Sequence, residues 1–292
     1  MREPNIPRPV APTRRPTIVF PPGATDCHAH VFGPQERYPL LPATHFVPHE
    51  TPWPDYRDML RSLGCSRAVL VQPSVYGTDN SAIEHALVQG QGDGFQLRAV
   101  AVVAPDIADQ ELDRLHSLGF RGIRFNTASG TKGLRLEHAL PLANRVARLG
   151  WHLQFYCDLP TQPEVEDVLV KLPVPFVIDH FGRVRSEQGV DSAPFKLLLR
   201  LLERPNCWAK LMGVYFTSDR FPRFEDITPL ARAMVQAAPD RLVWGTDWPH
   251  ASAREKLQAD ADLADMLGEW VPDTAGRRRV LVDNPARLYG FE

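Results

Sequence analysis

The feature that most constrains the fold of this chain is a repeated alternation. Eight short apolar or β-branched runs are each followed by a longer segment with the apolar spacing of a helix. The strand-like runs cover residues 24–32, 66–74, 97–105, 120–126, 151–158, 175–182, 207–213 and 241–249. The predicted helices cover residues 55–63, 80–89, 109–118, 136–149, 162–171, 193–203, 226–238 and 253–266, and a final helix spans about 273–288. This pattern indicates a covered parallel sheet, and eight units favour a (β/α)8 barrel over an open doubly wound sheet.

Length and glycine positions agree with one such domain. The chain has 292 residues, a length that barrels of this kind commonly reach as one domain. We predict a proline-rich N-terminal arm over residues 1–20 and a barrel over residues 21–292, closed by the C-terminal helix. Gly64, Gly119 and Gly150 each stand between a predicted helix and a strand-like run, where a left-handed residue ends a helix without a steric penalty.

Composition narrows the classes of partner. The formal net charge is −2 and no long basic run occurs, which argues against nucleic acid or an anionic membrane as the main partner. The sequence has no apolar stretch of about 18 residues and no secretory leader pattern. Four cysteines, at 27, 65, 157 and 207, lack CxxC spacing, so we expect reduced, structural thiols in a cytoplasmic protein. Whether the protein forms a homo-oligomer is left open.

Polar residues gather where the predicted strands end. In a barrel these ends form one face, which is where active sites lie. The residues concerned are His28, His30, Gln72, Ser74, Arg124, Asn126, Tyr156, Asp158, Asp179, His180, Arg183, Lys210, Asp247 and His250. Apolar strands have no structural need for charge at their ends, so this convergence predicts a functional site.

Structural explanations compete at several of these positions. Asp247 could cap the turn that follows it. His180 could simply pair with Asp179, and Arg124 could neutralise a core carboxylate. Tyr156 could be an ordinary strand aromatic.

The pair His28 and His30 lies in the stretch TDCHAHVFGP at residues 25–34. Side chains two apart in an extended segment share a face, so the two imidazoles should point together, with Asp26 on the same side. Such a pair suits a metal ion, a polarised carbonyl group, or neither.

Together, the HxH motif at 28–30, DHFGR at 179–183 and WGTDWPH at 244–250 resemble the amidohydrolase superfamily. More narrowly, they resemble its branch of 2-pyrone-4,6-dicarboxylate lactonases and sugar lactonases. The resemblance starts near residue 20, includes GIRFN at 122–126, and ends with VDNPARLYGF at 282–291.

The resemblance implies hydrolysis of the cyclic ester of a small acidic or sugar-derived lactone. Asp247 would activate water, while His28, His30, His180 and Tyr156 would surround the carbonyl. Arg124 and Arg183 would bind a substrate carboxylate, because a guanidinium offers a bidentate fork. Ser74, Lys210 and His250 are further candidates for substrate contact.

The resemblance also bears on metal content. Binuclear members of the superfamily carry a carboxylated lysine on strand four and a histidine on strand five, where this chain has Arg124 and Tyr156. A single divalent ion such as Zn²⁺ could bind His28, His30 and Asp247, with or without His180. The branch can work without metal, so we expect that no cofactor is required.

Two stretches depart from the dicarboxylate lactonases. Further arginines expected after RFN and after the seventh strand are absent, and Lys132 and Arg220 are imperfect substitutes. The segment KLMGVYFTS at 210–218 resembles instead a sugar-lactone isomerase of the same branch, but that enzyme lacks the HxH motif and the strand-eight aspartate. A metal-dependent decarboxylase, a lactone isomerase and a binding barrel without catalysis remain the alternatives.

Overall fold

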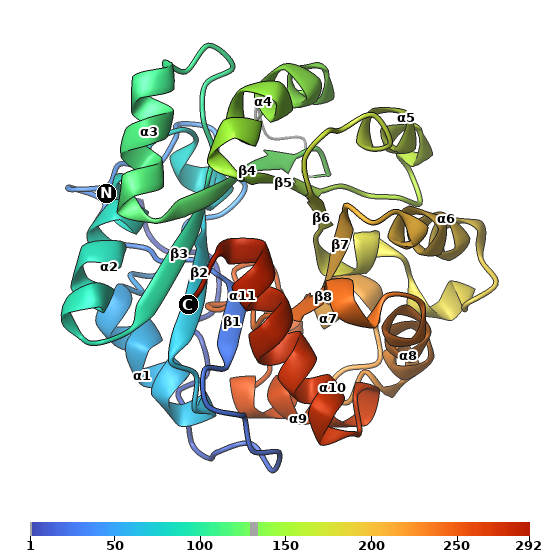
Figure 1. Cartoon of the computed structure of the whole chain (residues 1–292). Coiled ribbons are helices and arrows are strands. Elements are labelled where there is room, and N and C mark those ends of the chain that lie inside the picture. Colours follow the sequence, from blue (N-terminus) through green and yellow to red (C-terminus); the bar gives the residue numbers. More distant parts are fainter. Residues whose placement is uncertain (1, 129–133) are drawn as a thin grey trace.

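Eight parallel strands form the centre of the molecule, in the order β1 to β8, with helices around them (Figure 1). The computed structural model describes residues 2–128 and 134–292. The strands are β1 Thr25–Ala29, β2 Arg67–Val71, β3 Gln96–Ala101, β4 Phe120–Asn126, β5 His152–Tyr156, β6 Phe176–Ile178, β7 Cys207–Leu211 and β8 Leu242–Trp244. The prediction of a (β/α)8 barrel is confirmed.

The helices alternate with the strands as the sequence pattern predicts. They are α1 Trp53–Leu63, α2 Ser81–Gly92, α3 Asp109–Leu118, α4 Ala139–Val146, α5 Glu166–Leu169, α6 Ala193–Glu203, α7 Val214–Thr217, α8 Thr228–Ala237, α9 Asp260–Trp270, α10 Thr274–Arg278 and α11 Asn284–Tyr289. Short 3-10 turns fill several connections. No helix in the described part of the chain is long and apolar enough to cross a bilayer.

Local sequence explains why these helices begin and end where they do. In α1 the apolar residues that recur at helical spacing form its buried face, and Gly64 ends it with φ of 84°. Gly119 and Gly150 have φ of 111° and 65°, so all three predicted glycine stops are left-handed. The helix predicted at 253–266 instead begins at Asp260, because residues 254–256 form a separate 3-10 turn.

Two apolar layers surround the sheet. The outer layer packs the helices against the strands. The inner layer fills the barrel with strand residues of alternating direction and is built mainly from Val69, Val71, Val100, Val177 and Val243. Leu288, Tyr289 and Phe291 belong to this inner layer, so the C-terminal segment closes one end of the barrel and leaves the other end for a site.

The seam between β1 and β8 closes the barrel. Ala29 forms a parallel bridge with Trp248. The Asp247 N–H donates to the His28 carbonyl (2.9 Å), and the His30 N–H donates to the Trp248 carbonyl (2.7 Å). These bonds hold the end of β1 in register with the segment that follows β8.

A buried carboxylate, that of Asp26, reinforces the seam. It accepts hydrogen bonds from the Tyr56 hydroxyl (2.9 Å), the Thr246 hydroxyl (2.6 Å) and the Thr246 N–H (2.9 Å). Asp26 has no solvent exposure. It therefore links α1, β1 and the segment after β8 through polar contacts that water cannot replace.

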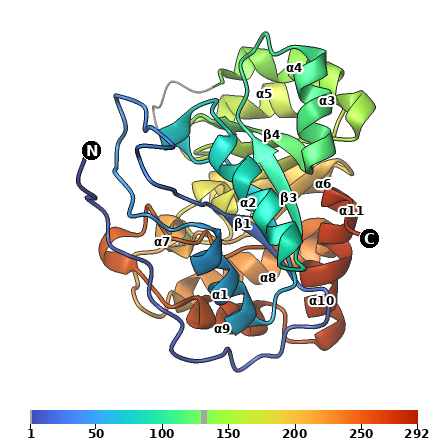
Figure 2. The same cartoon turned by 90° about the vertical axis from the view of Figure 1, so that its left-hand side faces the viewer.

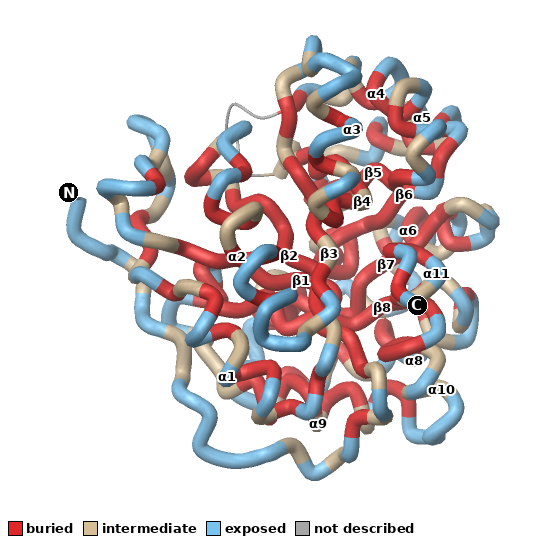
Figure 3. Tube along the Cα trace, turned by 60° about the vertical axis from the view of Figure 1, so that its left-hand side comes forward, coloured by how far each residue is buried: buried red, intermediate tan, exposed pale blue. Residues whose placement is uncertain are grey.

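The N-terminal segment lies along the outside of the same barrel (Figure 2). The Asn5 N–H donates to the Val47 carbonyl (3.0 Å), and the Thr17 hydroxyl donates to Asp265 of α9 (2.7 Å). Figure 3 shows this segment as mostly exposed, in contrast to the buried strands. Its polar anchors hold it against its own chain.

We predict that Asp26→Ala destabilises the protein strongly. The substitution leaves the Tyr56 hydroxyl and both Thr246 donors buried without an acceptor, which should lower the free energy of unfolding by about 3 kcal/mol or more. Urea titration at neutral pH measures this quantity. A loss below about 1 kcal/mol would show that the seam does not depend on this carboxylate.

Candidate active site

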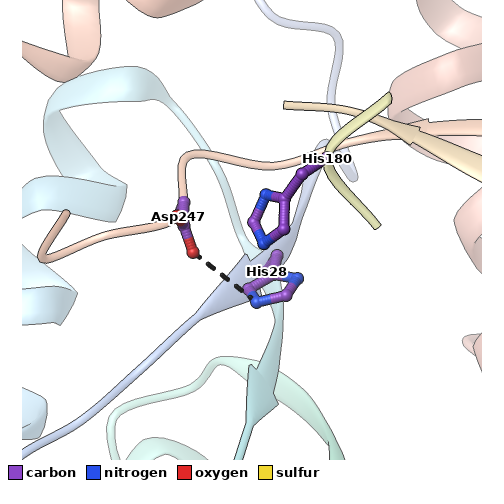
Figure 4. Close-up of side chains that lie close together, drawn as sticks. All are labelled: His28, His180 and Asp247. Atoms are coloured by element: carbon purple, nitrogen blue, oxygen red, sulfur yellow. Dashed lines mark ion pairs between the residues drawn. The ribbon is translucent and has the colours of Figure 1, made fainter. Parts of the chain in front are cut away.

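Three side chains from separate segments meet at the open end of the barrel (Figure 4). His28 lies on β1, His180 begins the 3-10 turn that follows β6, and Asp247 follows β8. The His28 Nε2 is 3.6 Å from Asp247 Oδ1, and the rings of His28 and His180 are 5.2 Å apart. His30 joins them, with its Nε2 3.5 Å from the same oxygen. The structure thus brings together four of the five residues that the sequence placed at the reaction centre, and the fifth, Tyr156, has its ring 5.0 Å from that of His180.

The backbone around these side chains is unusual. His180, Arg183, Asp247 and His250 all have positive φ, between 51° and 65°. Such conformations cost non-glycine residues of order 1–3 kcal/mol each and cluster at functional sites. The seam bonds and the packing around the turn after β6 hold these residues in place, so the site is set before any ligand binds.

Gly213, just after β7, packs against the ring of His180. Its φ is 70°, and a Cβ atom there would lie 2.2 Å from His180 Nδ1. The ring of His180 therefore occupies space that only a glycine leaves free.

A buried polar layer lies beneath the histidines. The Lys210 ammonium donates to the Cys27 carbonyl (2.9 Å), to Gln154 Oε1 (2.9 Å) and to His28 Nδ1 (3.1 Å). Gln154 Nε2 in turn donates to Asp179 Oδ2 (3.0 Å). With three acceptors and no exposure, Lys210 supports His28 from within the barrel. It does not face the mouth, where substrate contact was expected of it.

Arg124 sits above this layer. Its Nε is 3.5 Å from Asp179 Oδ2, and its guanidinium lies 5.5 Å from the Tyr156 ring centroid. Asp179 therefore balances the charge of Lys210 and part of that of Arg124.

The protonation states follow from burial and neighbouring charge. Burial lowers the pKa of His180 to about 4 and that of His28 well below its usual range. Burial alone would raise the pKa of Asp247, but the imidazoles of His180, His30 and His28 outweigh it and lower that pKa. At neutral pH the site holds an ionised Asp247 beside neutral His28 and His180.

Tyr156 and Arg183 form the wall toward β5. Arg183 donates to the Tyr156 hydroxyl oxygen and pairs with Asp158 through Nε (3.1 Å). Because the hydroxyl accepts this bond, its own proton stays free for another acceptor. The Arg183 guanidinium also lies over the Phe216 ring, 5.0 Å from its centroid.

The other predicted residues lie farther out. His250 is buried and pairs with Asp260 through Nε2 (2.9 Å), so its ring is turned toward the start of α9. Ser74 is half-buried at the start of a 3-10 turn after β2. Arg220 is exposed and 3.9 Å from Asp226. Lys132 lies outside the described residues.

Two aromatic residues of α7 were missed from the sequence. Tyr215 is buried and donates its hydroxyl to Asp247 Oδ2. Phe216 lies 4.9 Å from the His180 ring centroid. The segment KLMGVYFTS places them directly after a strand end, but aromatic residues at such a position are equally typical of packing.

The residues can hold one divalent ion. One ligand atom each from His28, His180 and Asp247 lies within 4.8 Å of the others. Among the described residues, His28 Nε2 is a buried atom without a hydrogen-bond partner, whereas the unpaired Nδ1 of His180 lies against Gly213. Two neutral imidazoles and a carboxylate are a ligand set that Zn²⁺ accepts. The expected ligand His30 is not in this group. Its Nδ1 contacts the Val71 carbonyl (2.7 Å), which leaves Nε2, 3.5 Å from Asp247 Oδ1, free to bind an ion.

The family model named Amidohydrolase matches residues 25–291 of this chain. The chain belongs to the amidohydrolase family. A 4-sulfomuconolactone hydrolase of Hydrogenophaga intermedia is 36% identical and covers 94% of this chain and 90% of its own. A 2-pyrone-4,6-dicarboxylate hydrolase of Comamonas testosteroni is 35% identical, covering 94% and 92%. A D-galactarolactone isomerase of Agrobacterium fabrum is 31% identical, covering 94% and 93%.

Solved structures agree with this family. A crystal structure of a probable 2-pyrone-4,6-dicarboxylic acid hydrolase from Acinetobacter baumannii with citric acid bound has a TM-score of 0.80 and 26% identity. The match covers 92% of this chain and 100% of that one. The amidohydrolase barrel is therefore shared along nearly the whole length.

We predict that Gly213→Ala displaces the His180 ring. The matched control is Gly150→Ala, because Gly150 has φ of 65° but no atom within 4 Å of the added Cβ. Gly150→Ala should lower the free energy of unfolding by roughly 1–2 kcal/mol for the left-handed backbone alone, and Gly213→Ala by about 1–3 kcal/mol more. Equal losses in the two variants, with His180 unmoved in a crystal structure, would contradict the prediction.

Proposed function

We propose that this protein is a lactonase that hydrolyses the cyclic ester of a small anionic lactone. The observation that carries the proposal is the ionised Asp247, whose Oδ1 faces the imidazoles of His28 and His30 at the barrel mouth. The family relatives named above act on lactones or are named for lactone hydrolysis, which supports the same reaction class. Ester hydrolysis needs a base for water and donors for the developing oxyanion.

Asp247 acts as the base in this mechanism. A water molecule held at its Oδ1 loses a proton to the carboxylate as its oxygen attacks the lactone carbonyl carbon. The ring C–O bond then breaks, and the proton passes from Asp247 to the leaving ring oxygen. The product is the open-chain acid, which carries the new hydroxyl group or its keto tautomer and releases the second proton of water to solvent as it ionises to the carboxylate.

The neutral imidazoles stabilise the oxyanion. His28 Nδ1 lies 3.1 Å from Lys210 Nζ and 3.5 Å from Asp179 Oδ1. Burial lowers the pKa of Lys210, and the adjacent Asp179 opposes that shift. In the proposed mechanism Lys210 is the ammonium, which can only donate to the nearer Nδ1. His28 then carries its proton on Nε2, which faces the mouth and can donate to the carbonyl oxygen. Tyr156, whose hydroxyl proton is free of Arg183, can donate in the same way.

Arg124 and Arg183 supply the recognition of an anionic substituent. Their guanidinium groups lie 5.5 and 5.4 Å from the centroid of the Tyr156 ring. Both are partly neutralised, Arg124 by Asp179 and Arg183 by Asp158. A substrate carboxylate or sulfonate would bind to the N–H donors of these arginines that the aspartates do not occupy, in place of water.

We further propose that the reaction requires no metal. A His28 that is protonated on Nε2 cannot ligate a cation through that atom, and the contact between Lys210 and His28 favours this tautomer. A bound ion would add Lewis-acid polarisation of the carbonyl. To hold it together with His180 and Asp247, His28 would have to lose its Nε2 proton.

Asp247→Asn should abolish hydrolysis. The amide cannot accept the proton of water, so kcat should fall at least ~100-fold, the usual contribution of a general base. The measurement is proton release over a panel of lactones with carboxylate, sulfonate or polyhydroxylated substituents, with product identity checked by NMR. Undiminished turnover in the variant would remove Asp247 from the base role, and an isomerised lactone as product would favour the isomerase.

Activity should survive removal of metal. We expect kcat/KM to stay within about twofold after dialysis against a strong chelator and elemental analysis of the dialysed protein, because His28 acts as a donor and no ligand exchange is needed. Loss of activity on chelation that Zn²⁺ restores would contradict this proposal. The same result with carbon dioxide as a product would favour the metal-dependent decarboxylase.

A further inference from the structure

The carboxylate of Asp247 has two oxygens in different surroundings. Oδ1 faces the His28 and His30 rings at 3.6 and 3.5 Å. Oδ2 points away from them and accepts the hydroxyl of Tyr215. Tyr215 is 7% exposed and Asp247 4%, so water has little access to this bond.

We propose that Tyr215 is a positioning residue that fixes the rotation of the Asp247 carboxylate, so that Oδ1 alone is presented to the attacking water. This inference rests on the proposed function, in which Asp247 is the base. It assigns a role to a residue that makes no contact of its own with the reacting carbonyl in that mechanism.

A single orientation of the Asp247 carboxylate requires a restraint beyond its backbone. The backbone of Asp247 is fixed by its left-handed conformation, φ 65°, and by its N–H bond to the His28 carbonyl (2.9 Å). The terminal torsion of an aspartate is nevertheless broad and nearly two-fold. A donor bound to one oxygen removes this freedom, because rotation would break a buried hydrogen bond.

Tyr215 is itself held firmly enough to act in this way. It lies in the single turn α7, which follows the left-handed Gly213. From outside, Lys256 donates to the Ser218 carbonyl (2.9 Å) and Arg185 donates to the Phe216 carbonyl (3.2 Å). The carbonyl groups of the turn are therefore tied to two neighbouring loops, those after β8 and β6.

The packing of the ring adds to these restraints. The Tyr215 ring lies 4.8 Å from that of Phe216 and 6.3 Å from that of His250. His250 is in turn paired with Asp260. The ring is thus enclosed on both sides, and its hydroxyl has one direction in which to donate.

The test compares Tyr215→Phe with Tyr56→Phe. The two substitutions remove the same kind of bond, a buried tyrosine hydroxyl to a buried aspartate, but Tyr56 serves the seam through Asp26. We expect Tyr215→Phe to lower kcat by about 10- to 100-fold, as loss of a group that orients a reacting residue usually does. KM should change less than about twofold, since no substrate contact is lost. Tyr56→Phe should leave both constants within about twofold of the parent protein.

Coupling to Asp247 gives the second measurement. If Tyr215 acts through this carboxylate, the double variant Asp247→Asn with Tyr215→Phe should be no slower than Asp247→Asn alone. A further fall in the double variant would overturn the inference. So would a normal kcat in Tyr215→Phe, or an equal loss in Tyr56→Phe.

A crystal structure of Tyr215→Phe decides the matter independently of substrate. We expect the Asp247 carboxylate to rotate or to occupy two orientations, and a single unchanged orientation would overturn the inference. If no lactone is hydrolysed by the parent protein, the proposed function fails, and this structure still tests the positioning role. If Asp247→Asn is inactive while Tyr215→Phe is fully active, only the inference about Tyr215 fails.

Discussion

The hydrogen bond from the Asp247 N–H to the His28 carbonyl is the contact on which the rest of this structure depends. It lies at the seam where the first and last strands of the barrel meet. The same bond that closes the barrel also places a carboxylate beside an imidazole, although the two residues are far apart in the sequence. Closure of the fold and assembly of the site are therefore one event. The neighbouring Asp26 network adds to the stability of the closed barrel, because it joins the two sides of the seam with buried polar contacts.

Charge is balanced in layers below and around the site. Asp179 sits between Lys210 and Arg124, while Asp158 pairs with Arg183. These ions therefore have partners, as low-dielectric surroundings require. Asp247 is the anion that faces the three imidazoles, and burial lowers the pKa of His28 and His180 so that both are neutral at neutral pH. A site of this kind can accept a proton at the carboxylate and donate hydrogen bonds from the rings without a large rearrangement.

The segment after β7 adds aromatic side chains to a site that is otherwise lined by charged and imidazole groups. Tyr215 and Phe216 place an aromatic surface beside His180 and Arg183. That surface limits where an anionic group can sit, since charge favours the guanidinium side and apolar atoms favour the Phe216 side.

Sequence periodicity determined the barrel. The alternation of apolar runs and helical segments specified eight units, and Gly64, Gly119 and Gly150 marked helix ends, because both signals are local properties of the chain. The start of α9 was misplaced by several residues, since residues 254–256 form a separate 3-10 turn before it. The strand-end rule likewise predicted that His28, His180 and Asp247 would share one mouth, because parallel strands place their carboxyl ends together.

Only the tertiary structure decided what each polar group does there. Lys210 ends a strand like the other candidates, yet its side chain points into the barrel and serves His28. His250 turns away to Asp260, and Tyr215, which no charge marked, reaches Asp247. Direction and partner depend on neighbours supplied by other segments, and the sequence of one segment carries no information about them. The sequence therefore determined which polar residues stand at the strand ends, whereas tertiary packing decided which hydrogen bonds each side chain makes.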